Sequence, residues 1–155
     1  MIKFIIVCLF LMPTMALAHK QPLPKNYDMI VRLTAATIYL EAGGESNQGK
    51  LGVASVIWNR ASGARDIPKV ILARNQFSCW NNRKYISFKP PKNKQYVYCL
   101  AVAKDMVNGT FVPPTIYKGV IYYHEQTLNP HWRYHFKMVT QIGNHLFYME
   151  KNMVV

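Results

Sequence analysis

The sequence predicts an α+β domain in which helices come first and a small antiparallel sheet comes last. Between residues 28 and 107, apolar side chains recur largely at helical spacing. After Pro113-Pro114, the chain changes to short runs rich in β-branched and aromatic residues, and a glycine-containing turn separates the last two. The sequence contains no internal repeat, low-complexity tract or separate binding module.

Four helices are expected, over residues 28–40, 46–61, 67–73 and 94–107. Asp28 is a plausible N-cap for the first helix, and Ser46 can cap the second. The second helix is apolar around most of its circumference, so it should be largely buried. Pro68 suits the first turn of the third helix, and Gly109 should end the fourth.

Three strands are expected, over residues 120–124, 136–141 and 145–149. Ile142-Gly143-Asn144, between the last two, has the composition of a hairpin turn. The segment from Asn75 to Pro91 is aromatic and basic and shows no regular periodicity, so it should be irregular.

The first eighteen residues are typical of a secretory signal peptide. A basic start at residues 1–3 precedes an apolar run at 4–12, and Ala16-Leu17-Ala18 matches a signal-peptidase site before His19. An uncleaved membrane anchor is the alternative, but the apolar run is short for a span of about 20 residues. We therefore expect a signal over 1–18, a flexible segment over 19–27, one folded domain over 28–155, and a periplasmic or secreted protein.

Export affects which cysteines remain in the protein and whether they are oxidised. Cys8 leaves with the signal, so Cys79 and Cys99 remain. In an oxidising compartment, an even pair predicts a disulfide, which would stabilise the fold by about 3 kcal/mol. Two free buried thiols are the alternative.

The formal net charge of +12 implies attraction to a polyanion. Nucleic acid is the usual partner of a basic chain, but export argues against it and no nucleic-acid-binding motif is present. Anionic polymers of the cell envelope are the expected partners. A local basic cluster forms either part of such a surface or a solvated loop; it consists of Arg83, Lys84, Lys89, Lys92 and Lys94.

Of seven acidic side chains, Glu41, Glu45 and Glu125 are candidates for acid–base chemistry, because the others lie within helices, in a turn or near the tail. Glu41 follows apolar residues and precedes two glycines. A carboxyl against apolar neighbours resists ionising and can serve as a general acid. The glycines leave room for a large polymer. An ordinary helix end at a glycine pair is the alternative interpretation.

Aromatic rings in loops or at strand ends suit a sugar-binding cleft, because pyranose faces stack on rings. The candidates are Phe77, Trp80, Tyr122, Tyr123 and Trp132. Core packing is the alternative for such rings. Neither a metal nor a cofactor is expected, since the histidines lack a convincing zinc spacing. Cys79 beside Ser78 is an alternative nucleophile.

Several sequence blocks follow one another in a characteristic order. They are Ile38–Glu45 (IYLEAGGE), Gly52–Arg60, Gln76–Asn81 (QFSCWN), Tyr122–His124, Asn129–Trp132 and Ile142–Tyr148. In this order and spacing, from around Ile30 to Met149, they resemble the SleB/CwlJ-type cell-wall hydrolases. The chain departs from that family at Gly43, where an arginine is often found, so any substrate contact made by that arginine is missing here.

The resemblance implies a peptidoglycan-degrading enzyme with a lysozyme-like catalytic domain. It would cleave the bond between N-acetylmuramic acid and N-acetylglucosamine as a lytic transglycosylase. The catalytic acid would be Glu41, the first glutamate of the E-A-x-G-E block. Acting first as acid and then as base, it would form a 1,6-anhydro sugar. A hydrolytic muramidase would need a second acid, either Glu45 or Glu125.

The resemblance also implies a set of substrate-binding or supporting residues: Glu45, Gln76, Phe77, Ser78, Tyr123, His124 and Trp132. The expected partner is the peptidoglycan glycan strand, and the protein is expected to be a monomer. Two alternatives from other classes are a metal-dependent amidase or peptidase that uses the histidines, and a non-catalytic wall-binding protein. The biological setting could be that of a phage endolysin or of a bacterial remodelling enzyme.

Overall fold

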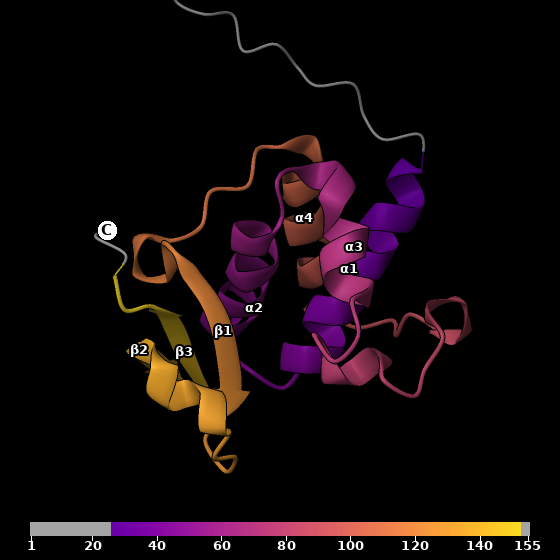
Figure 1. The fold of residues 1–155 in the computed structure, drawn as a ribbon. Helices are drawn as coiled ribbons and strands as arrows, with labels where there is room; N and C mark the ends of the chain where they lie inside the picture. Colours follow the sequence, from indigo (N-terminus) through magenta and orange to yellow (C-terminus); the bar gives the residue numbers. More distant parts are fainter. Residues whose placement is uncertain (1–25, 153–155) are drawn as a thin grey trace, which may run out of the picture.

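A computed structural model describes residues 26–152 of the chain (Figure 1). The predicted signal at 1–18, and all but the last two residues of the segment at 19–27, lie outside the described residues. Within this range, four α-helices precede a three-stranded antiparallel sheet, which confirms the α+β class. The elements are α1 (Tyr27–Ala42), α2 (Asn47–Arg60), α3 (Ile67–Leu72), α4 (Lys94–Asn108), β1 (Val120–Glu125), β2 (Phe136–Ile142) and β3 (His145–Glu150).

Helix α1 begins one residue earlier than predicted. Asn26 occupies the N-cap position, so the expectation that Asp28 caps the helix is wrong. Asp28 instead lies in the first turn, where its negative charge favours the helix dipole. The helix ends at Ala42, and Glu41 therefore projects from its last turn.

Helix α2 has the predicted cap, and α4 has a cap at Asn93 that was not predicted from the sequence. The hydroxyl of Ser46 accepts a hydrogen bond from the Gly49 N–H at 3.2 Å at the start of α2. At the start of α4, the Asn93 side chain accepts one from the Tyr96 N–H at 2.8 Å. Gly109 ends α4 in a left-handed conformation, with φ of 75°.

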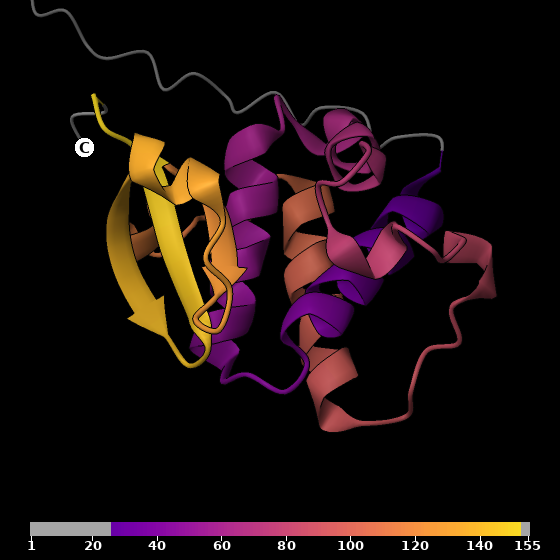
Figure 2. The same cartoon turned by 60° about the horizontal axis from the view of Figure 1, so that its bottom comes forward.

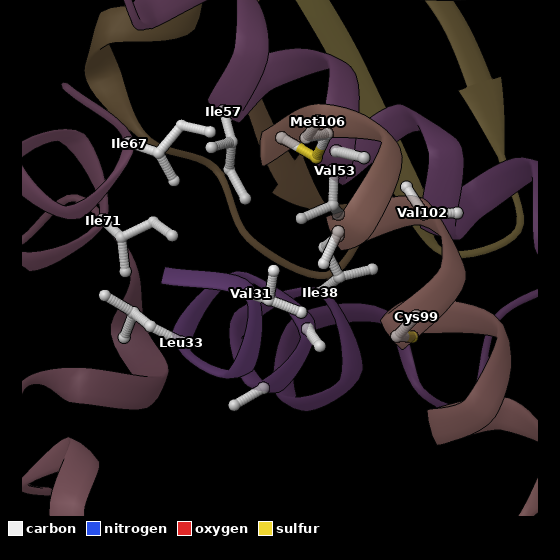
Figure 3. Packing of buried hydrophobic residues seen from close by; sticks show 14 of the residues in the cluster. Val31, Leu33, Ile38, Val53, Ile57, Ile67, Ile71, Cys99, Val102 and Met106 are labelled. Carbon is white, nitrogen blue, oxygen red and sulfur yellow. The ribbon is translucent and has the colours of Figure 1, made fainter. Parts of the chain in front are cut away.

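The main core lies among the four helices. Fully buried side chains from α1, α2 and α4 point toward one another, including those of Leu33, Ile38, Val53, Ile57 and Met106 (Figure 3). Helix α2 lies between α1 and α4 on one side and the sheet on the other (Figure 2). The close packing of α1 against α2 and α4 keeps the end of α1 in a fixed position. Within residues 26–152, no helix combines the length and apolar character needed to cross a bilayer.

The sheet has the strand order β1-β3-β2, and both pairs are antiparallel. The predicted hairpin turn joins β2 to β3, with Gly143 at φ of 56°. Phe147 packs on the helical layer at Gly52 of α2, where an added Cβ would collide with the Phe147 ring and come within 3.1 Å of Tyr117. The absence of a side chain at Gly52 therefore lets the sheet approach α2 closely.

The segment between α3 and α4 is irregular, as predicted, apart from two short 3₁₀ turns. It is fixed to α1 by Trp80, whose indole N–H donates to the Thr37 hydroxyl at 3.0 Å. Phe77 and Trp80 are only 2% and 9% exposed, so the expectation that they stack on a sugar is corrected: both belong to the core. This anchoring brings Ser78 and Cys79 to the end of α1.

Candidate active site

Three hydrogen-bond donors hold the carboxyl of Glu41. Its Oε1 accepts from the Cys79 backbone N–H at 2.9 Å and from the Ser78 hydroxyl at 3.3 Å. Its Oε2 accepts from the Tyr123 hydroxyl at 2.8 Å. The donors come from two segments that lie far from α1 in the sequence, so the fold itself assembles this arrangement.

Tyr123 reaches Glu41 from the middle of β1. Its ring packs against Phe147 and edge-on against His145, with centroid distances of 5.8 and 5.0 Å. Burial, and next the negative charge of Glu41, raise the pKa of the Tyr123 hydroxyl well above its ordinary value. The phenol therefore stays protonated and remains a donor to Glu41.

Glu41 lines a cavity of about 460 Å³ between the end of α1, the end of β1 and the β2–β3 turn. Gly43 and Gly44 form part of its wall, as do Glu45 and Glu125. A volume of this size can hold a small ligand. Both glycines thus border the cavity, but an added Cβ would meet open space only at Gly44, since at Gly43 it would collide with the backbone oxygen of Tyr39.

Glu45 supports the β2–β3 turn. Its two carboxylate oxygens lie 3.3 and 3.4 Å from the Asn144 N–H, which donates to them. The positive φ of Gly143 favours glycine, and a Cβ there would displace this carboxylate from its present position. Glu45 therefore joins the loop between α1 and α2 to the sheet.

His145 also lines the cavity and was not among the predicted site residues. The ring is 3% exposed, and its Nδ1 is buried without a hydrogen-bond partner in the described part of the chain. Burial lowers the pKa of His145, and the charges of Glu45, Glu125 and Glu41 partly oppose that effect. In the sequence it lies just after the predicted turn and within the Ile142–Tyr148 block that resembles the family, but neither signal gave it a role.

The remaining predicted site residues lie elsewhere. His124 and Trp132 pack together at 5.5 Å, and Tyr148 contacts both rings. Because side chains alternate along a strand, His124 faces away from the side of β1 on which Tyr123 meets Glu41. Gln76 is exposed and accepts a hydrogen bond from Arg60 at 3.0 Å.

The expected disulfide is absent: Cys79 and Cys99 are both free thiols. Cys79 lies in the turn beside Glu41 and has Glu41 and Arg83 as charged neighbours, whereas Cys99 is buried on α4 near Lys50. The two thiols thus have different charged neighbours. Burial, followed by the charge of Glu41, raises the pKa of the Cys79 thiol, which disfavours the nucleophilic thiolate.

Across residues 26–152, no group of three His, Cys, Asp or Glu side chains is close enough to hold a metal ion. The buried His124 instead has neutral partners. Its Nδ1 lies 2.7 Å from the Glu125 carbonyl oxygen, and its Nε2 lies 2.9 Å from the Tyr148 hydroxyl.

The fold is similar to two solved structures. The catalytic domain of the Bacillus cereus SleB protein is 24% identical, with a TM-score of 0.62; the match covers 84% of this chain and 98% of that one. The catalytic domain of the germination-specific lytic transglycosylase SleB from Bacillus anthracis is 26% identical, with a TM-score of 0.61, and the match covers 81% and 98%. No curated protein sequence matches the chain.

The family model described as Cell Wall Hydrolase matches residues 44–148, which is more than half of the chain. The matched segment begins at Gly44, just after Glu41, and includes Ser78, Tyr123 and His145. The predicted family is therefore confirmed, together with the prediction of a peptidoglycan-cleaving enzyme. The chain belongs to the cell wall hydrolase family.

Proposed function

We propose that the chain cleaves the β-1,4 bond between N-acetylmuramic acid and N-acetylglucosamine as a lytic transglycosylase. Glu41 acts as its single acid and base. The observation that carries the proposal is the Glu41 carboxyl, which lines a cavity while three donors fix its two oxygens. Similarity to the Bacillus anthracis lytic transglycosylase supports the type of reaction.

The reaction needs two proton transfers. Protonated Glu41 first gives its proton to the glycosidic oxygen, and the bond between that oxygen and C1 of the muramyl residue breaks. The carboxylate then removes the proton of the muramyl 6-hydroxyl as that oxygen bonds to C1. Glu41 regains its proton, the product carries a 1,6-anhydro end, and no water is consumed.

The hydrogen-bond donors around Glu41 act between these two proton transfers, when Glu41 is ionised. Cys79 N–H, Ser78 and Tyr123 stabilise the carboxylate while it carries its charge, and they keep it in place for the second transfer. The backbone N–H of Cys79 cannot be removed by a side-chain change, whereas the two hydroxyls can be tested.

A hydrolytic muramidase is the second candidate, and one observation favours it. Glu45 and Glu125 line the same cavity as Glu41. A hydrolase of the inverting type uses a second carboxylate to activate water. Glu45 accepts hydrogen bonds from the β2–β3 turn, so the exposed Glu125 is the better candidate for that base.

Glu41→Gln tests the proposal. This variant should fold normally and release muropeptides from purified sacculi at least about 100-fold more slowly than wild type, because the acid is gone. Glu150→Gln, which makes the same change at the exposed end of β3, should keep full activity. Glu125→Gln should remain active if the enzyme is a transglycosylase. Full activity of the Glu41→Gln variant contradicts the proposed mechanism.

We also propose that residues 28–155 form the catalytic domain and that a signal at 1–18 directs export to the periplasm or beyond. A wall polymer as substrate supports this location. Edman sequencing of the exported protein should begin at His19, after cleavage next to Ala18. A mature protein that begins at Met1 contradicts cleavage and indicates a retained anchor.

A further inference from the structure

A second cavity, of about 330 Å³, lies beside the end of α2 and α3. Arg60, Lys69 and Asp66 line it, so two cations face one carboxylate. Gln76 lines it as well. The cavity thus differs in charge from the one beside Glu41, where the ionisable carboxylates of Glu41, Glu45 and Glu125 are not matched by a lysine or arginine.

Arg60 is a partly buried cation whose hydrogen bonds within residues 26–152 go only to neutral acceptors. Its Nε donates to the Ile121 carbonyl at 2.6 Å and its Nη1 to Gln76 Oε1 at 3.0 Å. Burial lowers the pKa of the guanidinium. The guanidinium carbon lies 4.8 Å from the centroid of the Tyr122 ring, which offsets part of the cost of burial, and an anionic ligand would offset more. The side chain has five N–H donors, so three remain for a ligand.

The residues that bind Arg60 are each two positions from a residue that donates a hydrogen bond to Glu41. Gln76 precedes Ser78 by two residues, a separation of at most about 7 Å. Along β1, Ile121 binds Arg60, Tyr123 binds Glu41, and Glu125 lines the first cavity. Ile121 and Glu125 are about 13 Å apart on an extended strand, and Tyr123 lies between them. Glu41 lies in the wall of the acidic cavity, and its donors Ser78 and Tyr123 come from the two segments that bind Arg60 of the basic cavity.

The two sugars at the cleaved bond also differ in charge. N-acetylmuramic acid carries a stem peptide with free carboxylates, whereas N-acetylglucosamine carries no charge. Resting on the proposed function, we propose that the Arg60–Lys69 cavity binds a carboxylate of the stem peptide on the muramyl residue that is cleaved. In this arrangement the bound glycan strand runs along β1, with its muramyl residue toward Arg60 and its N-acetylglucosamine residue toward Glu125.

The test compares glycan strands whose stem peptides carry free carboxylates with the same strands after carbodiimide coupling to ammonia has converted those carboxylates to neutral amides. Wild type should cleave the strands with free carboxylates with a kcat/KM about tenfold higher, as expected for a charge-assisted hydrogen bond. Lys69→Gln should reduce this preference about threefold, through KM, since Lys69 is exposed. Lys104→Gln, which removes an exposed cation of α4 outside the cavity, should keep the wild-type preference.

Arg60→Gln should reduce the preference further, and a thermal unfolding scan checks that this variant is folded. Since Arg60 also binds Ile121 and Gln76, Lys69→Gln decides the question if the Arg60 variant unfolds. Equal cleavage of the two substrates by wild type overturns the stem-peptide site but not the proposed function. So does an unchanged preference in Lys69→Gln. If wild type cleaves neither substrate, the proposed function fails and the site fails with it.

Discussion

At the scale of single residues, the donors around Glu41 explain how one carboxyl can act twice. Oε1 and Oε2 are bound from different segments, so the carboxyl cannot rotate without breaking a hydrogen bond. A fixed carboxylate is already oriented for the second proton transfer, and little reorganisation is needed.

Tyr123→Phe should lower kcat about tenfold, because it removes one hydrogen bond to the charged carboxylate. KM should change little and the protein should stay folded, since the ring contacts with His145 and Phe147 remain. Steady-state kinetics on soluble glycan strands measures both constants. Tyr134→Phe removes an exposed hydroxyl and should behave as wild type. An unchanged kcat in the Tyr123 variant would mean that this hydrogen bond has no part in the chemistry.

His145 should make stability depend on pH. Burial lowers its pKa below the unfolded value of about 6.5, so the folded state binds fewer protons than the unfolded state. The stability that this difference contributes is complete above pH of about 6.5 and is lost as pH falls toward the lowered pKa. The nearby Glu41, Glu45 and Glu125 reduce the shift but do not reverse its direction.

His145→Phe should remove this part of the pH dependence, because phenylalanine keeps the ring contacts and binds no proton. Urea unfolding of both proteins at pH of about 7, 6 and 5 measures the effect. The free energy of unfolding of wild type should fall more steeply toward pH 5 than that of the variant. Parallel curves for the two proteins would show that His145 is not responsible.

At the scale of elements, the contact between α2 and the sheet depends on Gly52. Gly52→Ala should destabilise the fold by about 1–3 kcal/mol, because the new methyl group overlaps Phe147 and approaches Tyr117. The higher helix propensity of alanine, about 1 kcal/mol, offsets only part of this cost. Chemical denaturation measures the change. Gly44→Ala is a suitable control, since its added Cβ meets open space. Equal stability of the two variants would contradict the close packing at Gly52.

The regular elements could be predicted from the sequence because local signals determine them. The cap at Ser46, the helical stop at Gly109 and the turn at Gly143 were predicted, and all depend on chemistry within a few residues. Glu41 was also identified correctly as a residue beside glycines and open space. The blocks that resemble the family added the strongest evidence for its role.

The irregular segments could not be predicted in the same way, because tertiary contacts decide them. Trp80 lies in a loop but is buried, since its indole finds Thr37 on α1. The Cys79 N–H contacts Glu41 through the backbone, so its residue type carries no signal of this role. The two thiols are an even pair in the sequence, yet pairing depends on their positions in space.

At the scale of the whole molecule, basic and acidic side chains are distributed unevenly over the fold. Between Ile67 and Lys104 the sequence contains no acidic residue, and its eight lysine and arginine side chains are exposed. The acidic groups that line the main cavity come from the end of α1 and the end of β1. The exposed basic side chains, from which we expect attraction to anionic wall polymers, and the acidic groups of the cavity thus lie in different parts of the fold.

Mass spectrometry of the fragments that wild type releases from purified sacculi tests the central claim most directly. Cleavage by Glu41 alone, with the muramyl 6-hydroxyl as nucleophile, predicts 1,6-anhydromuramyl ends, which are about 18 mass units lighter than ends made by water addition. Reducing muramyl ends would contradict the transglycosylase mechanism and support the two-carboxylate muramidase. Free stem peptides with intact glycan strands would contradict glycan cleavage altogether.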